Sequence, residues 1–357
     1  AHEGAEHPSE IIIGSTMNVN WCDDSCVARG NTALGFYPTK IAGVESGPPI
    51  VEAVLDAADA VGLRVTLGLF IGGFNHSVSM LTYLAQMNSA MASELYALYA
   101  GHQSFAGFHV PMELKNCINC SQRGWDGQIN FNTPELRQRL IDVYVNPICD
   151  HIMSLAPHLP VGMPPSFFDQ NSFLGQVNGT WREAAPWGEG MEACRVQVPN
   201  LNRFTYQDCV GSAVFSDPFA DTVEYFRALR RAGDSANKRR ARPFQFWSDL
   251  ESFTFLQDYW VPAAVSTRKP AAMRRITGQL AAEASLVDGF TTYEWLFYLS
   301  PSGAPQVTQG AKGDIPHQSI NSNASLQNFL EYSRYLQMGA PPSLAHAPPW
   351  TLEPAST

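Results

Sequence analysis

The sequence lacks both the long apolar segments of a membrane protein and the basic excess of a nucleic-acid-binding protein. No run of about 18 apolar residues occurs, so we expect no membrane span. Among the 357 residues, 33 aspartates and glutamates outnumber 23 lysines and arginines, which gives a formal net charge of −10. Because contacts with phosphate groups require a basic surface, this balance argues against a nucleic-acid partner.

Motifs for nucleotide and metal binding are also missing. Neither a G-x-G-x-x-G turn nor a Walker A loop is present, so nothing indicates a nucleotide site. The 9 histidines are scattered and form no H-x-H or H-E-x-x-H motif, which argues against a metal-dependent hydrolase. We therefore expect no cofactor and no bound metal.

The chain opens on the polar stretch AHEGAEHPSE, which does not contain the apolar core of a signal peptide. It is therefore either cytosolic or a secreted chain from which the signal has been removed. Four N-x-S/T triplets favour the second alternative, since such triplets accept N-linked glycans in secreted proteins. They begin at Asn75, Asn119, Asn178 and Asn323. We expect a secreted or extracellular glycoprotein.

Two close pairs of cysteines are present, Cys22/Cys26 and Cys117/Cys120. Their spacing suits a zinc site, but no histidine-rich segment accompanies them. Asn119 also makes a glycosylation triplet inside the second pair, which would serve no purpose in a cytosolic zinc knuckle. Short-loop disulfides are therefore the favoured reading of both pairs, with a structural metal or reduced thiols as the alternatives.

Of the 7 cysteines, three remain outside these two pairs, so at least one of them has no disulfide partner within this set of three. Cys194 and Cys209 are expected to form a third disulfide bond. Cys149 lies in a segment with helical periodicity, so we expect it to be a buried thiol without a disulfide partner.

Strands and helices are expected to alternate along most of the chain. Seven β-prone runs are present, over residues 11–17, 63–70, 105–113, 159–168, 202–209, 242–253 and 289–295. Helical periodicity occurs over residues 49–61, 78–99, 134–155, 218–232, 270–286 and 324–337. Such alternation indicates a parallel sheet with helical crossovers.

The favoured fold is an α/β (β/α)8 TIM-type barrel, although a closed barrel needs one strand more than the seven recognised. Either one strand escapes recognition, or the barrel is open, or its first strand is completed from outside this chain. A doubly wound open sheet is the alternative, but no nucleotide motif supports it. Residues 1–302 are expected to form the barrel, and residues 303–357 a C-terminal helix and a proline-rich tail packed on it.

Carboxylates lie near the ends of several predicted strands. In a (β/α) barrel the C-terminal ends of the strands meet at one rim, where catalysis takes place. Two-residue alternation places His109 with Glu113 on one face of the third run, and Asp249 with Glu251 on one face of the sixth. The carboxylates at the rim are Glu113, Asp208, Asp249, Glu251 and Glu294. The aromatic residues near the same ends, with flat faces for sugar rings, are Phe167, Trp247, Tyr293, Trp295 and Tyr298.

Four segments, GFHVPMEL, FTYQDCVG, FWSDLESF and TTYEWLFYLSP, follow one another in the order found in the domain-of-unknown-function family numbered 4434. The chain resembles this family of (β/α)8 proteins, which is related to glycoside hydrolases, over most of residues 10–302. In the family a first strand precedes the segment similar to IIIGSTM here, so this sequence departs from the pattern at its start. The resemblance implies a glycosidase-like site without naming a sugar.

If that first strand is absent, Glu113 ends the fourth family strand and Glu251 the seventh. On these strands the retaining enzymes of glycoside hydrolase clan A carry the acid/base and the nucleophile, so the resemblance implies those roles here. Glu113 would protonate the leaving oxygen and Glu251 would attack the anomeric carbon, with about 5–5.5 Å between the two carboxyls. A gap of about 6.5–9.5 Å would instead admit water and predict inversion.

Other polar residues near these glutamates have supporting roles in this interpretation. His109 and Asp249 precede the two glutamates on the same strand faces, and would tune a pKa or hold a carboxylate in place. Asp208 and Glu294 are second choices for the catalytic roles. The expected substrate-binding residues are His109, Asp208, Trp247, Asp249, Tyr293, Glu294 and Trp295.

The leading interpretation is a secreted glycoside hydrolase that acts on a polysaccharide or glycoconjugate. Each candidate also has a purely structural interpretation, since a glutamate at a strand end can cap a helix or pair with an arginine, and His109 can be a hydrogen-bonded core residue. The alternative function is a catalytically inactive barrel that binds glycans or serves in an extracellular assembly. The separation of the two carboxyls distinguishes these functions.

Overall fold

The computed structural model describes residues 10–18, 24–71, 78–112, 134–165, 192, 194–211, 218–255, 268–271, 273–293 and 330. At its centre lies a seven-stranded sheet in which all neighbouring strands run parallel. The strands, in an order that is the same in space and along the chain, are β1 (Glu10–Ile13), β5 (Arg64–Gly68), β7 (Phe105–His109), β8 (Val161–Met163), β9 (Arg203–Gln207), β10 (Gln245–Glu251) and β13 (Gly289–Tyr293). Each of the seven predicted runs therefore contributes a strand to this sheet.

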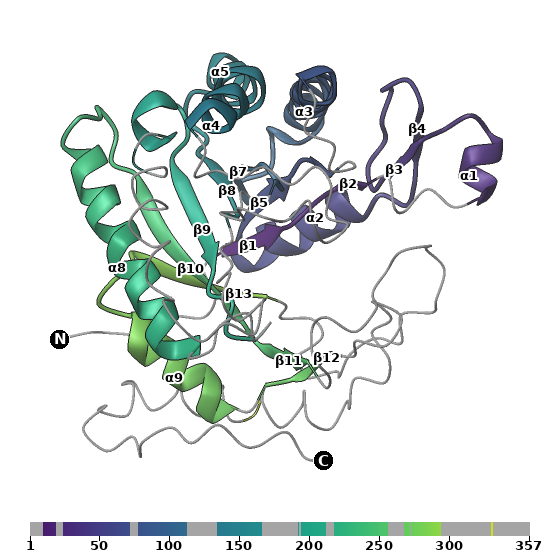
Figure 1. The fold of residues 1–357 in the computed structure, drawn as a ribbon. Helices are drawn as coiled ribbons and strands as arrows, with labels where there is room; N and C mark the ends of the chain where they lie inside the picture. Colours follow the sequence, from purple (N-terminus) through teal and green to yellow (C-terminus); the bar gives the residue numbers. More distant parts are fainter. Residues whose placement is uncertain are drawn as a thin grey trace.

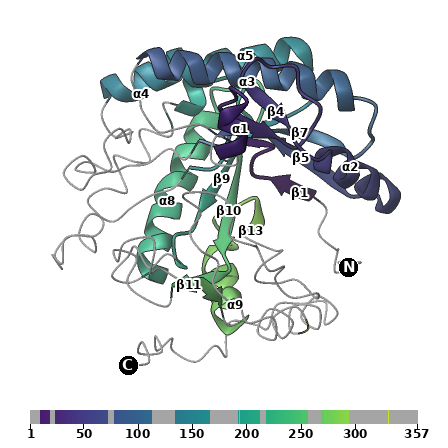
Figure 2. The same ribbon diagram turned by 90° about the vertical axis from the view of Figure 1, so that its right-hand side faces the viewer.

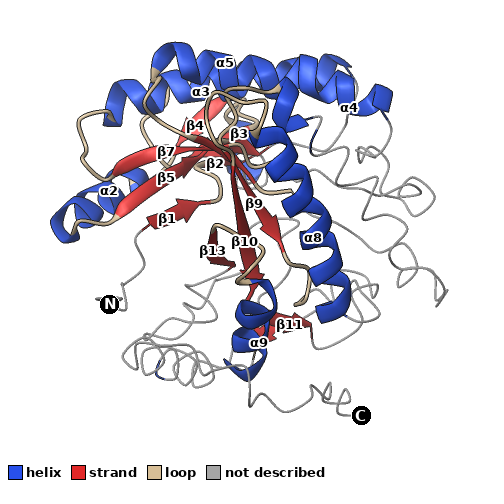
Figure 3. Ribbon diagram, turned by 90° about the vertical axis from the view of Figure 1, so that its left-hand side faces the viewer, coloured by secondary structure: helices blue, strands red, loops and turns tan. Residues whose placement is uncertain are grey.

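Helices lie around the outside of the sheet (Figures 1 and 3), and those whose bounds fall within the described residues connect every pair of successive strands except β8 and β9. They are α2 (Ile50–Val61), α3 (Val78–Tyr99), α4 (Pro134–Leu140), the π-helical turn η3 (Ile141–Val145), α5 (Asn146–Leu155), α8 (Pro218–Asn237) and α9 (Met273–Glu283). Helices α3 and α5 run side by side along one side of the molecule (Figure 2). The sheet curls as far as a half-barrel, and this is the α/β fold of TIM-barrel type that the sequence predicts.

Helix α2 shows how the sequence pattern produces these elements. Val51, Leu55 and Ala58 are buried at spacings of four and three, which places them on one face of the helix. The helix ends at Gly62, whose φ of 71° lies in the left-handed region that glycine adopts readily. None of the described helices is both long and apolar enough to cross a membrane.

Short elements outside the central sheet are missing from the sequence interpretation. They are the helix α1 (Asp24–Ala28), a four-stranded sheet of β2 (Met17–Asn18), β3 (Ala33–Gly35), β4 (Val44–Ser46) and β6 (Phe70–Ile71), and an antiparallel pair of β11 (Phe253–Phe255) and β12 (Arg268–Pro270). The prediction of one strand over residues 11–17 is wrong, because the chain leaves the central sheet after Ile13 and Met17 pairs with Gly35 and Phe70. Strands of two or three residues are too short to show a periodicity. The predicted C-terminal helix and tail, 303–357, lie outside the described residues apart from Leu330.

The predicted disulfide bond between Cys194 and Cys209 is wrong, because both residues are buried thiols. Burial raises the pKa of the Cys194 thiol to about 12, and the charge of Arg195 acts against that rise. The Sγ atom of Cys209 instead lies 3.5 Å from the carbonyl oxygen of Gln207 at the end of β9. Cys149 is a buried thiol in α5, as expected. The predicted short-loop pairs remain predictions, since Cys22, Cys117 and Cys120 lie outside the described residues.

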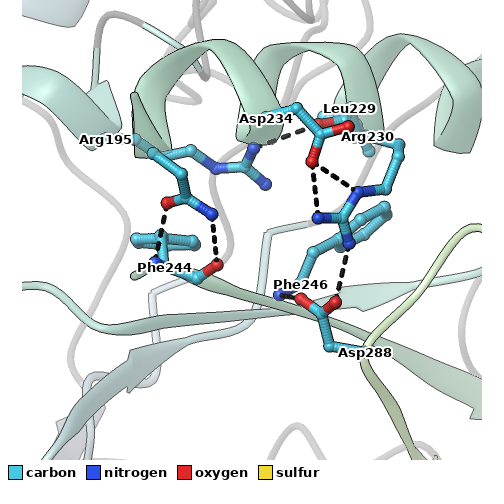
Figure 4. Close-up of polar contacts among 8 residues, drawn as sticks. Arg195, Leu229, Arg230, Asp234, Phe244, Phe246 and Asp288 are labelled. Carbon is cyan, nitrogen blue, oxygen red and sulfur yellow. Dashed lines mark hydrogen bonds and ion pairs between the residues drawn. The ribbon is translucent and has the colours of Figure 1, made fainter. Parts of the chain in front are cut away.

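Two arginines attach α8 to the strands beneath it (Figure 4). The buried guanidinium of Arg195 lies 4.7 Å from the ring centroid of Phe244 and donates a hydrogen bond to the carbonyl oxygen of Leu229 at 3.0 Å. Arg230 on α8 pairs with Asp288 at 2.7 Å, and Asp288 in turn accepts the N–H of Phe246 at 2.8 Å. The helix, the start of β10 and the turn before β13 are thereby held together.

An ion pair crosses the concave inner face of the sheet. Glu10 begins β1 and Arg203 begins β9, 193 residues later, yet their side chains lie 2.8 Å apart and are each 5% exposed. Four inter-strand steps separate these strands, and at about 4.8 Å per step a flat sheet would hold them roughly 19 Å apart. The contact therefore requires the sheet to curl. Burial alone would raise the pKa of Glu10, but the hydrogen bond and charge of Arg203 and the hydroxyl of Thr66 lower it overall.

Replacing Glu10 with alanine should destabilise the fold by about 3–5 kcal/mol, because it leaves the buried guanidinium of Arg203 without its counter-charge. The measurement is urea unfolding at pH 7. Glu45→Ala is the matched control, since it breaks the surface pair between Glu45 and Arg29, whose side chains are 26% and 53% exposed. That control should lose less than about 1 kcal/mol, and equal losses in the two variants would contradict the role given to Glu10.

Candidate functional site

The two faces of β10 have different environments, as strand alternation requires. The ring of Phe246 packs against Phe226 of α8 with centroids 5.1 Å apart, and the hydroxyl of Ser248 donates to Glu283 of α9. These residues therefore face the outer helices. The alternate residues, Trp247, Asp249 and Glu251, face the concave side, and the predicted placement of Asp249 with Glu251 on one face of the strand is confirmed.

The floor of the concave face is built around Arg203 and Trp247. The guanidinium of Arg203 lies 4.4 Å from the ring centroid of Trp247. Gly162 lies next to both Arg203 and His109, because a Cβ atom at Gly162 would lie 3.4 Å from Nε of Arg203 and 3.7 Å from Nδ1 of His109. Within the described part of the chain, four buried atoms of this floor have no hydrogen-bond partner, namely His109 Nδ1, Arg203 Nε, Thr205 Oγ1 and Trp247 Nε1. These four atoms can therefore form hydrogen bonds with further polar groups.

His109 is a neutral residue of this floor. It is 4% exposed, and burial lowers the pKa of its imidazole to about 3, helped by the nearby charge of Arg203 and opposed by Glu10. A neutral imidazole offers one donor and one acceptor but no charge. His109 can therefore orient a carboxyl by hydrogen bonding, and it cannot stabilise a carboxylate as a cation at neutral pH.

At the rim, Asp249 and Glu251 lie on the last residues of β10. Thr291 lies opposite Asp249 on β13, and its hydroxyl donates a hydrogen bond of 2.8 Å to the Asp249 carboxylate. Glu251 lies opposite Tyr293 and is 4% exposed. The concave face thus carries two carboxylates, two residues apart, at the C-terminal end of one strand.

Several predicted site residues lie outside the described residues. The chain after β7 is held by a hydrogen bond of 2.8 Å from the N–H of Val110 to Gly162, and its described part ends at Met112, directly before Glu113. The predicted residues outside the described part are Glu113, Glu294, Trp295 and the side chain of Tyr293, together with the glycosylation triplets at Asn75, Asn119, Asn178 and Asn323. Their predicted roles remain predictions.

Asp208 lies on the outer face of the sheet, away from the concave floor. Its carboxylate is fully buried, accepts the side-chain amide of Gln279 on α9, and accepts the backbone N–H of Glu251 at 3.2 Å. Burial raises the pKa of Asp208, while the hydrogen bond from Gln279 and the charge of Arg275 act in the lowering direction. Asp208 therefore contacts the main chain of Glu251 from the outer face of the sheet.

The sequence interpretation missed a polar stripe on α9 that surrounds Asp208. Arg275, Gln279 and Glu283 recur every four residues, so they lie on one helix face, and this face is directed at β10. Polar residues at this spacing in an otherwise buried segment are a detectable sequence pattern. Glu10 and Arg203 were also missed, and no local pattern links two residues so far apart in the chain.

As pH rises, the free energy of unfolding should fall less steeply in Glu283→Gln than in the wild-type protein. Burial raises the pKa of Glu283, and the nearby charge of Asp208 raises it further against the hydroxyl of Ser248. The folded protein therefore keeps a proton that the unfolded chain releases above about pH 4.3. This contribution is complete below that pH and is lost as pH rises through the folded pKa.

The slope of unfolding free energy against pH should become less negative by up to about 1.4 kcal/mol per pH unit in Glu283→Gln. Urea unfolding at a series of pH values between 4 and 9 measures this slope. Glu224→Gln, at a surface pair with Arg227 on α8, provides the baseline for removing one carboxylate. An unchanged slope in Glu283→Gln would show that this carboxyl titrates alike in the folded and unfolded chains.

The curled parallel sheet, the outer helices and the carboxylates at the C-terminal rim define an α/β protein of the TIM-barrel type. The chain belongs to the family described as domain of unknown function 4434 (DUF4434), whose model matches residues 30–306. This match confirms the family indicated by the sequence resemblance. A comparison with curated protein sequences found no match.

Solved structures with a similar fold include a protein from Bacteroides thetaiotaomicron that is provisionally named an α-L-fucosidase. It is 15% identical, with a TM-score of 0.58 over 92% of this chain and 81% of the other. The intracellular xylanase TsXylA from Thermoanaerobacterium saccharolyticum is 9% identical, with a TM-score of 0.48 over 91% of this chain and 88% of the other. At this level of identity the likeness to the first protein establishes a shared fold and nothing further.

Proposed function

We propose that the protein is a secreted glycoside hydrolase that cleaves glycosidic bonds in a polysaccharide or glycoconjugate by a retaining mechanism. The observation that carries this proposal is the position of Asp249 and Glu251, on the concave face at the C-terminal end of β10. In TIM-type barrels, active sites are built at this end of the strands. The described chain after β7 ends at Met112, and Glu113 is the next residue in the sequence.

The order of the strands supports the pairing of Glu113 with Glu251. Strand β7 is third and β10 is sixth in the described sheet, an interval of three. The same interval separates the fourth and seventh strands, which carry the acid/base and the nucleophile in the retaining enzymes of glycoside hydrolase clan A. Two carboxylates from strands at this interval can approach one sugar from opposite sides of a curled sheet.

In this mechanism the carboxylate of Glu251 attacks the anomeric carbon while Glu113 protonates the departing glycosidic oxygen. Glu113 then removes a proton from water, which displaces the sugar from Glu251 with its original configuration. His109 precedes Glu113 by four residues and can orient it as a neutral hydrogen-bonding partner. Asp249 is held by Thr291 on the same face, where it can bind sugar hydroxyl groups.

Secretion is a further part of the proposal. The four glycosylation triplets support it, and all of them lie outside the described residues. Treatment of protein produced in a secreting eukaryotic host with a glycan-removing amidase should lower its apparent mass. Substitution of all four triplet asparagines by glutamine should remove the difference in apparent mass between treated and untreated protein.

Glu251→Gln and Glu113→Gln should each lower the rate of glycoside hydrolysis by about 10²–10⁴-fold, since each removes a group that acts on the reacting atoms. The assay is a panel of aryl glycosides that includes α-L-fucosides, the class named for the structural relative. Thr292→Val is the control, because Thr292 occupies the alternate position on the neighbouring strand, opposite Leu250. Undiminished hydrolysis in either glutamine variant would remove its assignment.

Azide should separate the two roles. In Glu251→Ala, azide can occupy the space of the nucleophile and restore activity, with a glycosyl azide of inverted configuration as the product. In Glu113→Ala, azide should intercept the glycosyl-enzyme and give a product of retained configuration. A wild-type protein that binds glycans but hydrolyses none of the panel would favour the inactive barrel instead.

A further inference from the structure

The main chain of Glu251 lies where β10 continues beyond β9. The ladder between these strands ends at the pair Asp249 and Gln207, whereas the ladder between β10 and β13 continues to Glu251. The carbonyl oxygen of Asp249 accepts the N–H of Asp208 at 3.1 Å, so it points toward β9. In a strand, residues two apart direct their N–H and C=O groups to the same side. Glu251 therefore directs both groups toward β9, beyond the end of that ladder.

The side chains of Asp208, which is buried, and Arg275, which is half-buried, bond to the backbone of Glu251 where the ladder with β9 has ended. Oδ1 of Asp208 accepts the N–H of Glu251 at 3.2 Å. Nη2 of Arg275 donates to the carbonyl oxygen of Glu251 at 2.9 Å and also to that of Phe253. Both backbone groups of Glu251 are thus fixed by side chains from the outer face, while its own side chain belongs to the concave face.

Asp208 is itself fixed on three sides. Its Oδ2 accepts the amide of Gln279, and its Oδ1 also accepts the N–H of Val210 at 3.2 Å. Cys209, between Asp208 and Val210, has a φ of 57°. It is the one residue other than glycine in the left-handed region in the described part of the chain. This turn takes the chain out of the ladder directly after Asp208 and leaves the place opposite Glu251 to its carboxylate. A strained residue held by its surroundings at such a place is typical of a functional region.

We propose that Asp208 and Arg275 are positioning residues that set the direction of the Glu251 side chain by holding its backbone. This inference rests on the nucleophilic role of Glu251 in the proposed function. Reactions of this kind are sensitive to the position of the attacking atom, and a displacement of about 1 Å can lower the rate about 10²-fold.

The first test is hydrogen exchange at the backbone amide of Glu251, which requires no activity. Asp208→Ala should speed this exchange at least about 10-fold relative to Ser248→Ala. Ser248 is the matched control, because it is buried on the same strand and faces α9 but bonds to Glu283 rather than to Glu251. Equal exchange at Glu251 in the two variants would overturn the proposal.

The conservative variant Asp208→Asn should restore slow exchange. An asparagine Oδ1 can still accept the N–H of Glu251, and its amide can donate to Oε1 of Gln279, which has no hydrogen-bond partner among the described residues. If Asp208→Ala does not fold, Asp208→Asn and Arg275→Lys are compared with wild type. Arg275→Lys should then exchange faster at Glu251 than Asp208→Asn does, and the opposite order would contradict the proposal.

The second test is kinetic. In Asp208→Ala, kcat should fall about 10²-fold with KM changed by less than about 3-fold, because the positioned group acts in the transition state. Ser248→Ala should change neither constant by more than about 3-fold. A fall in kcat without faster exchange at Glu251 would overturn the positioning role. If Glu251→Gln leaves hydrolysis intact, the catalytic assignment fails, and the exchange experiment still decides whether Asp208 and Arg275 hold the strand end.

Discussion

The ion pair between Glu10 and Arg203 is the contact on which the shape of the inner face depends. It joins the first and fifth strands of the sheet across the concave side, and it exists only because the sheet is curled. Arg203 in turn lies against Trp247 and near His109. This charge pair therefore positions the residues of the floor beneath the proposed catalytic rim. Because the charges of Glu10 and Arg203 cancel, the floor suits uncharged polar groups such as sugar hydroxyls.

The outer face of β10 supports the structure, and its inner face carries the proposed reacting groups. The outer face carries a polar cluster in which Asp208, Gln279 and Glu283 are buried under α9 and Arg275 is half-buried. The inner face carries Asp249 and Glu251 at the rim. Alternation along one strand links the faces, because a side chain that fixes the backbone from outside also fixes the direction of the neighbouring inner side chain. Rigid support of this kind is what a reacting carboxylate requires.

Much of the architecture was predictable because it depends on local periodicity. All seven central strands appear in the sequence as β-prone runs separated by helical ones, and two-residue alternation grouped Asp249 with Glu251 correctly. Asp208 shows the limit of this reasoning. It directly follows β9, and its position near a strand end suggested the rim, but it falls on the outer-facing side of the alternation and bonds to α9. The expected bridge between Cys194 and Cys209 failed because spacing along the chain says little about which sulfur atoms meet.

The sequence by itself determined the alternation of strands and helices, the family, and which residues of β10 share a face, since each follows from patterns within a few residues. Only the tertiary structure decided that Glu10 pairs with Arg203, that α9 presents its polar stripe to the end of β10, and that Asp208 holds Glu251 from behind. These contacts join segments between 35 and 193 residues apart. Their geometry depends on how far the sheet curls and where each strand stops, and no local propensity encodes either quantity.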